Sequence, residues 1–323
     1  MIMGFDVKAE VKLDATKSAE LAAEGCVKGS NKLFELCFGK RMADNIRYAA
    51  LTAAQTERDL QSVLSGEAEF RDGNIVPVTL PSVGNLLLDA ERQQELENLH
   101  ANLKIAYHEL ESVPDDEISD REVGSDFFAR WRREAKVIGE SDLQFIWGKV
   151  LAEEIRSPDS ISYRTLDVIK NLTKREAEVF HKASGYIFNK HGVVMVEGKT
   201  SVTYNDIVVL SECGLVVPGV NGTMATFSDA IFYEGKKGCF TRFEGCVFVL
   251  LGEQRISIAC SLLTEAGKQL YNIIDRKMMR KEDFVFVAGA MKVQRGDKIS
   301  VRVLPLVDEN RVDVSNLYFA GEV

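Results

Sequence analysis

The chain has 323 residues, 46% of them hydrophobic and 28% charged, and a formal net charge of −9 at pH 7. This is the composition of a folded globular protein, and it excludes collagen-like, wholly disordered and disulfide-stapled mini-protein classes. The length predicts about two domains, and the sequence has no run of about 18 uncharged apolar residues that would predict a membrane-spanning helix.

The negative charge belongs to the first half of the chain. Residues 1–170 carry 21 Lys and Arg against 31 Asp and Glu, whereas residues 171–283 carry 14 against 13. An acidic half repels nucleic acid and leaves only local basic patches for binding phosphate. The six cysteines are scattered without Cys-x-x-Cys pairs, and the first residues carry charges that a signal peptide would lack. We therefore expect reduced thiols and a cytoplasmic location.

Residues 1–112 are predicted to form a helical arm. Helical character runs through residues 15–64, interrupted by Gly29 and Ser30. An apolar stripe from Ile46 to Val63 recurs at spacings of three and four, which places it on one side of a helix.

A Pro- and Gly-rich break at 66–85 is predicted to be extended, because Pro77 and Pro81 cannot continue a helix. A second long helix is predicted at about 86–112. Its apolar stripe has the same spacing and consists of Leu96, Leu99, Leu103, Ala106 and Leu110. We expect this stripe to pack on the first one or on a second copy of the chain, because monomers rarely expose such a surface.

Residues 113–172 carry the strongest helical pattern and are predicted to form a separate helical module. Ser125 is expected to cap one helix, and the next helix carries Trp147 in the middle of a wide apolar face. Pro158 ends this helix, and Ser162 is expected to cap a short third one.

Residues 173–283 alternate helices with β segments. Thr173 and Glu176 form a capping box, with a hydroxyl at the N-cap and a carboxylate three residues later. The order of helix, short strand, helix, hairpin and helix resembles a winged-helix module, chiefly through SECGLVVPG and LLTEAGKQL. Residues 284–323 are predicted to be a C-terminal β segment that begins with FVFVA. The predicted fold is therefore α+β, a helical N-terminal half followed by a winged-helix-like, β-rich C-terminal half.

The text SDFFARWRREAKVIGESDLQFIWGKVLAEEIRSPDSISYRTLDVIKNL at 125–172 resembles the signature block of an uncharacterised bacterial domain-of-unknown-function family, DUF2806. The residues that carry the resemblance are Phe127, Phe128, Leu143, Trp147, Leu151, Ala152, Glu154, Pro158, Ser160, Ser162, Arg164, Thr165 and Leu166. The resemblance implies no reaction and no cofactor, but it implies a loose association with phage-defence and mobile-element genes. Pro77, Pro81 and the β segment at 284–323 depart from the family pattern.

The structural signature residues are predicted to be Phe127, Trp131, Trp147, Pro158 and Arg164. Both tryptophans lie on apolar stripes and are expected in the core. Arg164 follows the turn at Pro158. We expect its guanidinium to bind loop carbonyls or Glu154, because it offers several donors to one turn.

The sequence predicts no catalytic residue, no metal site and no cofactor. It contains no phosphate loop, GxSxG or HExxH motif. The candidate nucleic-acid contacts are Lys236, Lys237 and Arg242 in the predicted hairpin, and Lys199 near the start of the second helix of the winged-helix-like module.

These observations favour a non-enzymatic cytoplasmic interaction or scaffold protein that binds a protein partner or a second copy of itself. A DNA-binding regulator that uses the winged-helix-like module is the first alternative, and a divergent hydrolase is the second. The charge balance predicts that duplex DNA is bound no tighter than about 10 μM, within the range of non-specific binding.

Overall fold

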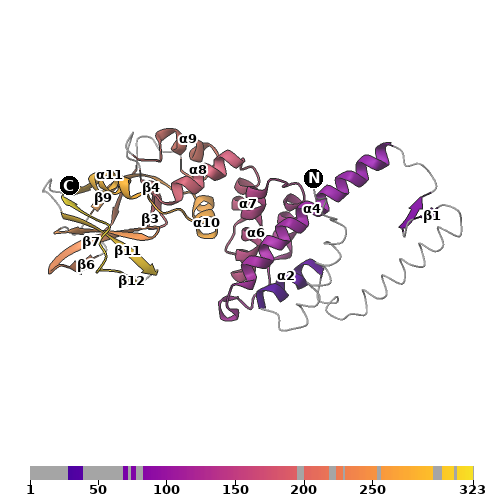
Figure 1. Cartoon of the computed structure of the whole chain (residues 1–323), viewed down its shortest axis with the longest axis horizontal. Helices are drawn as coiled ribbons and strands as arrows, with labels where there is room; N and C mark the ends of the chain where they lie inside the picture. Colours follow the sequence, from indigo (N-terminus) through magenta and orange to yellow (C-terminus); the bar gives the residue numbers. More distant parts are fainter. Residues whose placement is uncertain are drawn as a thin grey trace, which may run out of the picture. The chain divides into compact units, whose positions relative to one another are not determined.

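The computed structural model describes residues 28–38, 68–71, 74–77, 83–194, 200–217, 223–227, 230–252, 256–293, 300–308 and 311–322. The chain divides into two compact units (Figure 1). Unit 1 comprises residues 1–139 and 147–160, and unit 2 comprises residues 140–146 and 161–323. The predicted boundaries at 112, 172 and 283 stay predictions.

Unit 1 is mainly helical where the structure describes it. Its elements are α2 (Lys28–Phe38), the hairpin β1 (Ala68–Arg71) and β2 (Asn74–Pro77), α4 (Val83–Glu111), the 3-10 helix η1 (Asp115–Glu117), α5 (Ser125–Ala135) and the larger part of α6 (Ser141–Arg156). The β1–β2 hairpin confirms the extended character predicted between the two helical stretches, and the long second helix is confirmed as α4.

The core of unit 1 forms where α4, α5 and α6 meet. Trp131, Trp147 and Leu151 are fully buried there. Gly148 lets α6 approach α4 closely, since a Cβ at this position would lie only 2.6 Å from Ile105 and 2.9 Å from the carbonyl of Asn102. The absence of a side chain therefore brings the two helices into contact.

Two details of unit 1 correct the predictions. Gly29 and Ser30 do not interrupt a helix but lie in the first turn of α2, where a Cβ on Gly29 would lie 3.0 Å from Leu110. Close packing against α4 explains a glycine at this point. Ser125 is the first residue of α5 rather than its cap, which is Gly124 and makes no side-chain hydrogen bond. The stripe from Ile46 to Val63 lies outside the described residues.

Unit 2 contains the remaining helices. They are α7 (Tyr163–Ile169), α8 (Lys174–Ser184), α9 (Tyr204–Glu212), α10 (Glu265–Ile273), the 3-10 helix η2 (Lys281–Asp283) and α11 (Phe284–Ala290). Local capping sets where they begin. Ser162 caps α7 and Thr264 caps α10, and the predicted capping box of Thr173 and Glu176 is confirmed at α8.

Two antiparallel sheets complete unit 2. In the first, β9 (Ile256–Leu262) pairs with β4 (Gly192–Val194), β5 (Thr223–Phe227) and β10 (Met291–Val293), and β3 (Ile187–Phe188) pairs with β4. The second has the order β12 (Arg311–Val312), β11 (Ser300–Asp308), β8 (Cys246–Leu251), β7 (Lys236–Phe243), β6 (Ala230–Tyr233), and β13 (Phe319–Glu322) also pairs with β11.

The second sheet is curled. Val247, Val249 and Leu304 form a buried apolar cluster on one of its faces. Ile231 on β6 and Val312 on β12 both pack against this cluster, although these strands stand at opposite ends of the strand order. The sheet therefore bends into a half-barrel around its own apolar face.

The predicted α+β class is confirmed, with a helical N-terminal half and a β-rich C-terminal half (Figure 1). The winged-helix resemblance stays a prediction. No helix in the described ranges is both long enough and apolar enough to cross a membrane.

The predicted strand FVFVA is wrong, because these residues begin the helix α11. The alternation of Phe and Val is typical of a strand, but the burial follows a helical period. Phe284, Val287 and Ala288 are buried while Val285 and Phe286 are exposed. Packing of this one side, together with the small residues Ala288 to Ala290, overrides the local preference for a strand.

We predict that Gly267→Ala destabilises unit 2. A Cβ on Gly267 in the first turn of α10 would lie 2.1 Å from the backbone carbonyl of Leu215, which cannot move aside like a flexible side chain. The cost should be at least the roughly 1–3 kcal/mol typical of overpacking, measured by urea unfolding. Gly289→Ala is the control, because its Cβ would meet nothing within 4 Å. Equal stability of the two variants would contradict the prediction.

Candidate functional site

Trp131 and Trp147 bind each other through two reciprocal hydrogen bonds. The indole N–H of Trp131 on α5 donates to the carbonyl of Trp147 at 2.9 Å, and the indole N–H of Trp147 on α6 donates to the carbonyl of Trp131 at 3.1 Å. Both side chains are completely buried. Burying an indole without a partner for its N–H would be unfavourable. Each tryptophan therefore provides the acceptor for the indole N–H of the other.

The same corner holds Phe127 and Phe128, the aromatic pair of the signature block. Phe127 and Phe128 are buried, and the Phe128 ring stacks on Trp131 with centroids 5.8 Å apart. Arg132 lies over the outer face of Phe128, 5.7 Å from its centroid. This part of the block therefore packs helices together and leaves no aromatic face open for a ligand.

Two asparagines of α4 that the apolar pattern did not predict support the end of α5. Asn98 donates to the carbonyl of Lys136 at 2.8 Å, and Asn102 donates to the carbonyl of Ala135 at 3.1 Å. Both asparagines are buried. They satisfy the last carbonyls of α5, which have no partner within their own helix. The only sign of this role in the sequence is that the two asparagines are four residues apart and lie beside an apolar stripe.

The turn at Pro158 is bound by Arg121 and Glu154. Arg121 donates to the carbonyl of Pro158 and pairs with the carboxylate of Asp159 at 3.0 Å. Glu154 is buried and accepts from the backbone N–H of Asp159 at 2.8 Å. Pro158 itself is buried. Arg121 thus binds this turn. Arg164, for which we expected a contact with loop carbonyls or Glu154, lies exposed on α7 of unit 2, and its role stays a prediction.

The Ser and Thr of the signature block connect α7 to α10 within unit 2. The carboxamide oxygen of Gln269 accepts from the backbone N–H of Ser162 at 3.0 Å and from the hydroxyl of Thr165 at 2.5 Å. The two hydroxyls also contact each other at 2.9 Å. Gln269 lies more than one hundred residues further along the chain, so only the fold brings it to this position.

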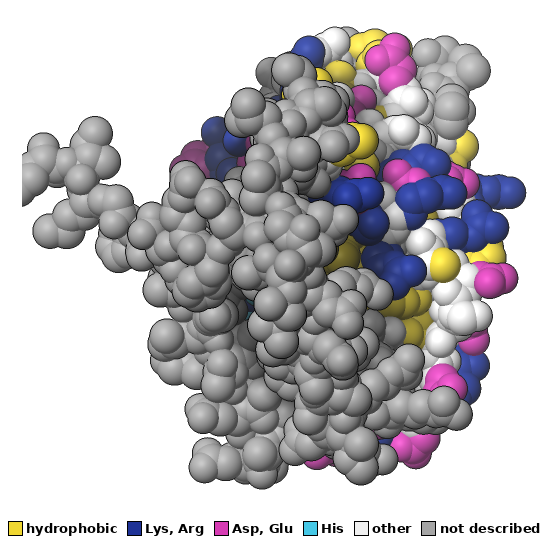
Figure 2. Space-filling model, turned by 90° about the vertical axis from the view of Figure 1, so that its right-hand side faces the viewer, with side chains coloured by type: hydrophobic (Ala, Val, Ile, Leu, Met, Phe, Trp, Pro, Cys, Tyr) yellow, Lys and Arg dark blue, Asp and Glu magenta, His cyan; other side chains and the backbone are white. Residues whose placement is uncertain are grey.

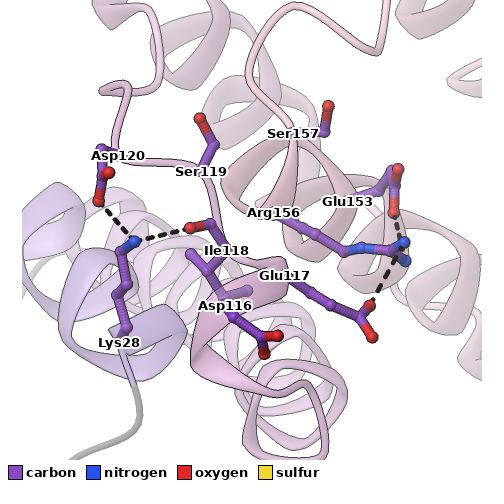
Figure 3. A pocket seen from close by; sticks show the side chains of 9 residues that line it. All are labelled: Lys28, Asp116, Glu117, Ile118, Ser119, Asp120, Glu153, Arg156 and Ser157. Atoms are coloured by element: carbon purple, nitrogen blue, oxygen red, sulfur yellow. Dashed lines mark hydrogen bonds and ion pairs between the residues drawn. The ribbon is translucent and has the colours of Figure 1, made fainter.

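An open pocket of about 590 Å³ lies in unit 1 between the start of α2, η1 and the end of α6 (Figure 3). Its lining residues are Lys28, Asp116, Glu117, Ile118, Ser119, Asp120, Glu153, Arg156 and Ser157. The Lys28 ammonium donates to the carbonyl of Ile118 at 2.7 Å and pairs with Asp120 at 2.5 Å. Arg156 pairs with Glu153 at 3.5 Å and with Glu117 at 3.7 Å.

The pocket is acidic, but its charged groups mostly pair with one another. The hydrogen bond from Lys28 lowers the pKa of Asp120. Burial raises the pKa of Glu153 in spite of the neighbouring Arg156. A carboxyl group with a raised pKa is a feature of some active sites. Here the Glu153 carboxylate pairs with Arg156, and the contacts of Lys28 across the pocket connect α2 to the rest of unit 1.

The side of α5 that faces solvent carries arginines. Arg130 and Arg133 line a second, shallower hollow together with Asp126 and Ala129. Arg133 pairs with Glu134 at 3.0 Å. Figure 2 shows Lys and Arg side chains gathered among acidic and hydrophobic ones on the side of the molecule that it views. Opposite charges are therefore interspersed on this surface.

Three of the candidate nucleic-acid contacts lie in the described residues, and they do not converge on one patch. Lys199 lies outside the described residues. Lys236, Lys237 and Arg242 are exposed on β7. Because alternate residues of a strand face opposite sides, Lys237 lies opposite Lys236 and Arg242. Those two are six residues, or about 20 Å, apart along the strand. Their role in binding nucleic acid stays a prediction.

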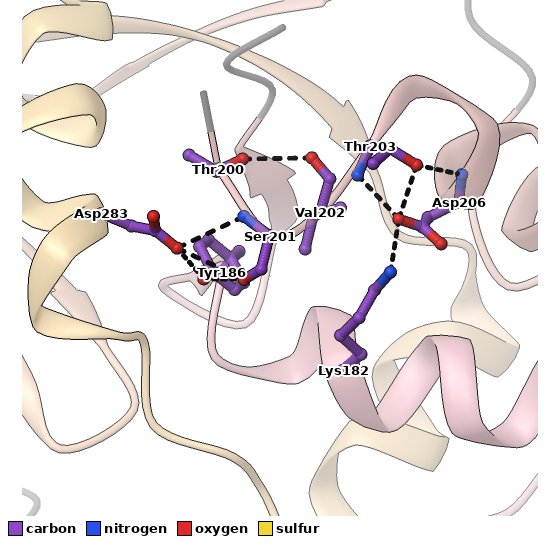
Figure 4. A network of polar contacts seen from close by, with 8 residues as sticks. All are labelled: Lys182, Tyr186, Thr200, Ser201, Val202, Thr203, Asp206 and Asp283. Atoms are coloured by element: carbon purple, nitrogen blue, oxygen red, sulfur yellow. Dashed lines mark hydrogen bonds and ion pairs between the residues drawn. The ribbon is translucent and has the colours of Figure 1, made fainter. Parts of the chain in front are cut away.

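A buried network around Asp283 joins three segments of unit 2 (Figure 4). Arg280 binds both carboxylate oxygens of Asp283, at 3.0 and 3.1 Å. The hydroxyl of Tyr186 donates to the same carboxylate, and the backbone N–H of Ser201 donates to it at 3.3 Å. This network anchors the start of α11 to the turn after α8 and to the segment before α9.

A second carboxylate in Figure 4, that of Asp206, lies in the first turn of α9. Asp206 accepts from the backbone N–H of Thr203 at 2.7 Å and pairs with Lys182 at 2.6 Å. Burial alone would raise the pKa of Asp206, but the hydrogen bonds from Lys182 and Thr203 outweigh it and lower the pKa. For Asp283 too, burial is outweighed by the hydrogen bonds from Arg280, Tyr186 and Ser201, which lower its pKa.

Residues 85–193 match a family described as a protein of unknown function (DUF2806). The resemblance drawn from the signature block is therefore confirmed, and the match runs from α4 to β4. Neither a curated protein nor a solved structure matches the chain. Within the described ranges, no group of three or more His, Cys, Asp or Glu side chains is placed to hold a metal ion.

We predict that Trp147→Ala lowers the free energy of unfolding by about 3–5 kcal/mol, the usual cost of removing a large aromatic side chain from a core. Trp147→Phe keeps most of the volume but removes the indole donor, so it should cost less than Trp147→Ala. Chemical denaturation of the full chain measures both. A melt of Trp147→Ala within a degree or two of the wild type would contradict the buried pairing.

The network around Asp283 predicts a loss of stability in acid. A carboxyl group whose pKa is lower in the folded state stabilises the fold above its ordinary pKa of 3.8, and this contribution disappears as the pH falls through the folded value. Asp283→Asn should therefore be less stable than the wild type at pH 7, by roughly 1–3 kcal/mol. The difference in the free energy of unfolding between Asp283→Asn and the wild type should become smaller as the pH falls into the acid range.

Urea unfolding at a series of pH values measures this difference. Asp116→Asn is the control, because Asp116 is exposed and lies outside the network. A stability difference between Asp283→Asn and the wild type that stays constant with pH would contradict the assignment.

Proposed function

We propose that the protein is a non-enzymatic interaction or scaffold protein that associates with a second copy of itself through the first half of α4. The polar groups of the signature block support this proposal. The two tryptophans, Glu154 and the Ser162–Thr165 pair all use their hydrogen-bonding atoms within their own unit. A block used in this way stabilises a scaffold rather than presenting chemistry to a substrate.

The observation that carries the proposal is the exposed part of the apolar stripe on α4. Ala106 and Leu110 at its C-terminal end are buried, and Leu99 and Leu103 are half-buried. Leu96 remains 60% exposed. Leu88, three turns before Leu99 on nearly the same side of the helix, is 53% exposed. The stripe thus continues beyond the part that packs within unit 1.

Covering such leucines is favourable. A fully buried leucine side chain contributes about 1.5–3 kcal/mol relative to an exposed one. A helix of another copy could cover Leu88, Leu96 and the exposed edge of Leu99 together, as in helix-to-helix recognition. A cytoplasmic location, and the setting in phage defence or on a mobile element that the family resemblance implies, are part of the same proposal.

We predict that the wild-type chain is oligomeric and that Leu88→Glu with Leu96→Glu makes it monomeric without unfolding it. Both side chains are exposed, so the substitutions remove contacts between copies and leave the core of unit 1 unchanged. Mass photometry gives the mass, and circular dichroism checks the helices. Val137→Glu, at another exposed apolar residue of unit 1, should stay oligomeric. A monomeric wild type, or an oligomer that survives the double substitution, would contradict the proposal.

A further inference from the structure

A rigid basic segment crosses the surface of unit 2 between α10 and η2. Four of the six residues from Arg276 to Lys281 are Lys or Arg. The backbone N–H of Lys277 donates to the hydroxyl of Ser184 at 2.8 Å, and Met279 is buried. A Cβ on Gly185 would lie 2.5 Å from the carbonyl of Lys277, so the segment lies directly on this glycine. The backbone of the segment is therefore held in place.

The Lys and Arg side chains of this segment extend into solvent from a backbone that is held in place. Lys277, Arg280 and Lys281 are exposed. Arg280 is held by Asp283, and the ammonium of Lys281 lies over the ring of Tyr318 at 4.6 Å from its centroid. These contacts orient the side chains, so less conformational entropy would be lost when they meet an anionic ligand.

Exposed apolar side chains lie beside these cations. η2 and α11 form a continuous helical run, so Val285 follows Lys281 by one turn, on the same side. Val285 is 46% exposed and Phe286 is 36% exposed. Tyr318, which contacts Lys281, is preceded by Leu317, itself 47% exposed. The fold thus brings Tyr318 next to Lys281, and the exposed Leu317 lies one residue before it in the chain.

We propose that this basic–apolar surface, formed by Lys277, Arg280, Lys281, Val285, Phe286 and Leu317, binds the headgroup region of an anionic phospholipid membrane. Lys and Arg side chains near an anionic leaflet are attracted to it. Apolar side chains beside them gain from entering the boundary between headgroups and acyl chains. The surface offers both features within one short stretch.

The apolar side chains favour a membrane over a nucleic acid. Phosphates of a duplex would attract the three cations equally well, but its backbone would give Val285, Phe286 and Leu317 little to bury against. Two acidic residues oppose these cations, because Glu282 is exposed next to Lys281 and Asp283 pairs with Arg280. The net charge of −9 also opposes binding, but charges more than about 8 Å from the surface are screened at physiological salt. We therefore expect weak, reversible binding that depends on salt.

Co-sedimentation of the full chain with vesicles tests the proposal. The vesicles contain phosphatidylcholine with phosphatidylglycerol, and vesicles of phosphatidylcholine alone serve as the neutral comparison. We expect binding to the anionic vesicles only, and a decrease as the ionic strength rises beyond about 0.1 M, where the Debye length is about 10 Å. Equal binding to both kinds of vesicle, or to neither, would overturn the proposal.

Matched variants locate the surface. Lys277→Ala with Lys281→Ala should weaken vesicle binding about 30-fold, from roughly 1 kcal/mol for each lysine. Lys236→Ala with Lys237→Ala makes the same charge change elsewhere in unit 2 and should leave binding unchanged. Val285→Ser with Phe286→Ser should also weaken binding, whereas Val307→Ser with Val314→Ser, at exposed apolar residues of the same unit, should not.

A labelled DNA duplex separates the two kinds of anionic ligand. We expect it to bind no tighter than about 10 μM at physiological salt. Tight duplex binding that is lost in Lys277→Ala with Lys281→Ala, without vesicle binding, would reassign the surface to nucleic acid. Vesicle binding does not depend on the association through α4, so the double glutamate variant at Leu88 and Leu96 should still sediment with anionic vesicles.

Discussion

The reciprocal pairing of Trp131 and Trp147 is the constraint on which unit 1 depends. Each indole is fully buried and needs an acceptor, and each finds it on the backbone of the other helix. This requirement determines both the separation of α5 and α6 and their relative rotation. Gly148, immediately after Trp147, then allows α4 to approach α6 more closely than any side chain would permit. The asparagines of α4 reach the end of α5 because of this close packing.

Several polar residues of the signature block also hold elements together. Glu154 binds the turn that ends α6, and Ser162 and Thr165 bind the glutamine of α10. Buried polar groups with satisfied hydrogen bonds specify one arrangement of helices, because any other arrangement would leave them unpaired. The block therefore reads as an architectural signature. The two surfaces for which we propose binding lie outside it, on the first half of α4 and on the segment before α11.

In unit 2, short segments are instead held in place by contacts with single buried residues. Asp283 gathers Arg280, Tyr186 and Ser201, and Ser184 and Gly185 hold the chain at Lys277. Met279 is buried between these anchors, whereas Lys277, Arg280 and Lys281 face solvent. A surface built on such anchors is presented rigidly, and its exposed lysines and apolar residues keep their positions relative to one another.

The sequence by itself determined the elements whose causes are local. A helix begins or ends where neighbouring side chains bind its backbone. Residues within a few positions of each other therefore determine the capping boxes, the long helix α4, the helices around Trp147 and the mixed character of the second half. The family resemblance was likewise readable from contiguous text.

Only the tertiary structure decided the rest. FVFVA became a helix because one of its sides packs, and Gly29 and Ser30 lie within a helix because Leu110 lies against them. The turn at Pro158 is bound by Arg121, which lies 37 residues away in the chain, because proximity in the chain does not determine which guanidinium reaches a carbonyl. Burial and hydrogen-bond satisfaction act between residues that are distant in sequence, and no local pattern contains that information.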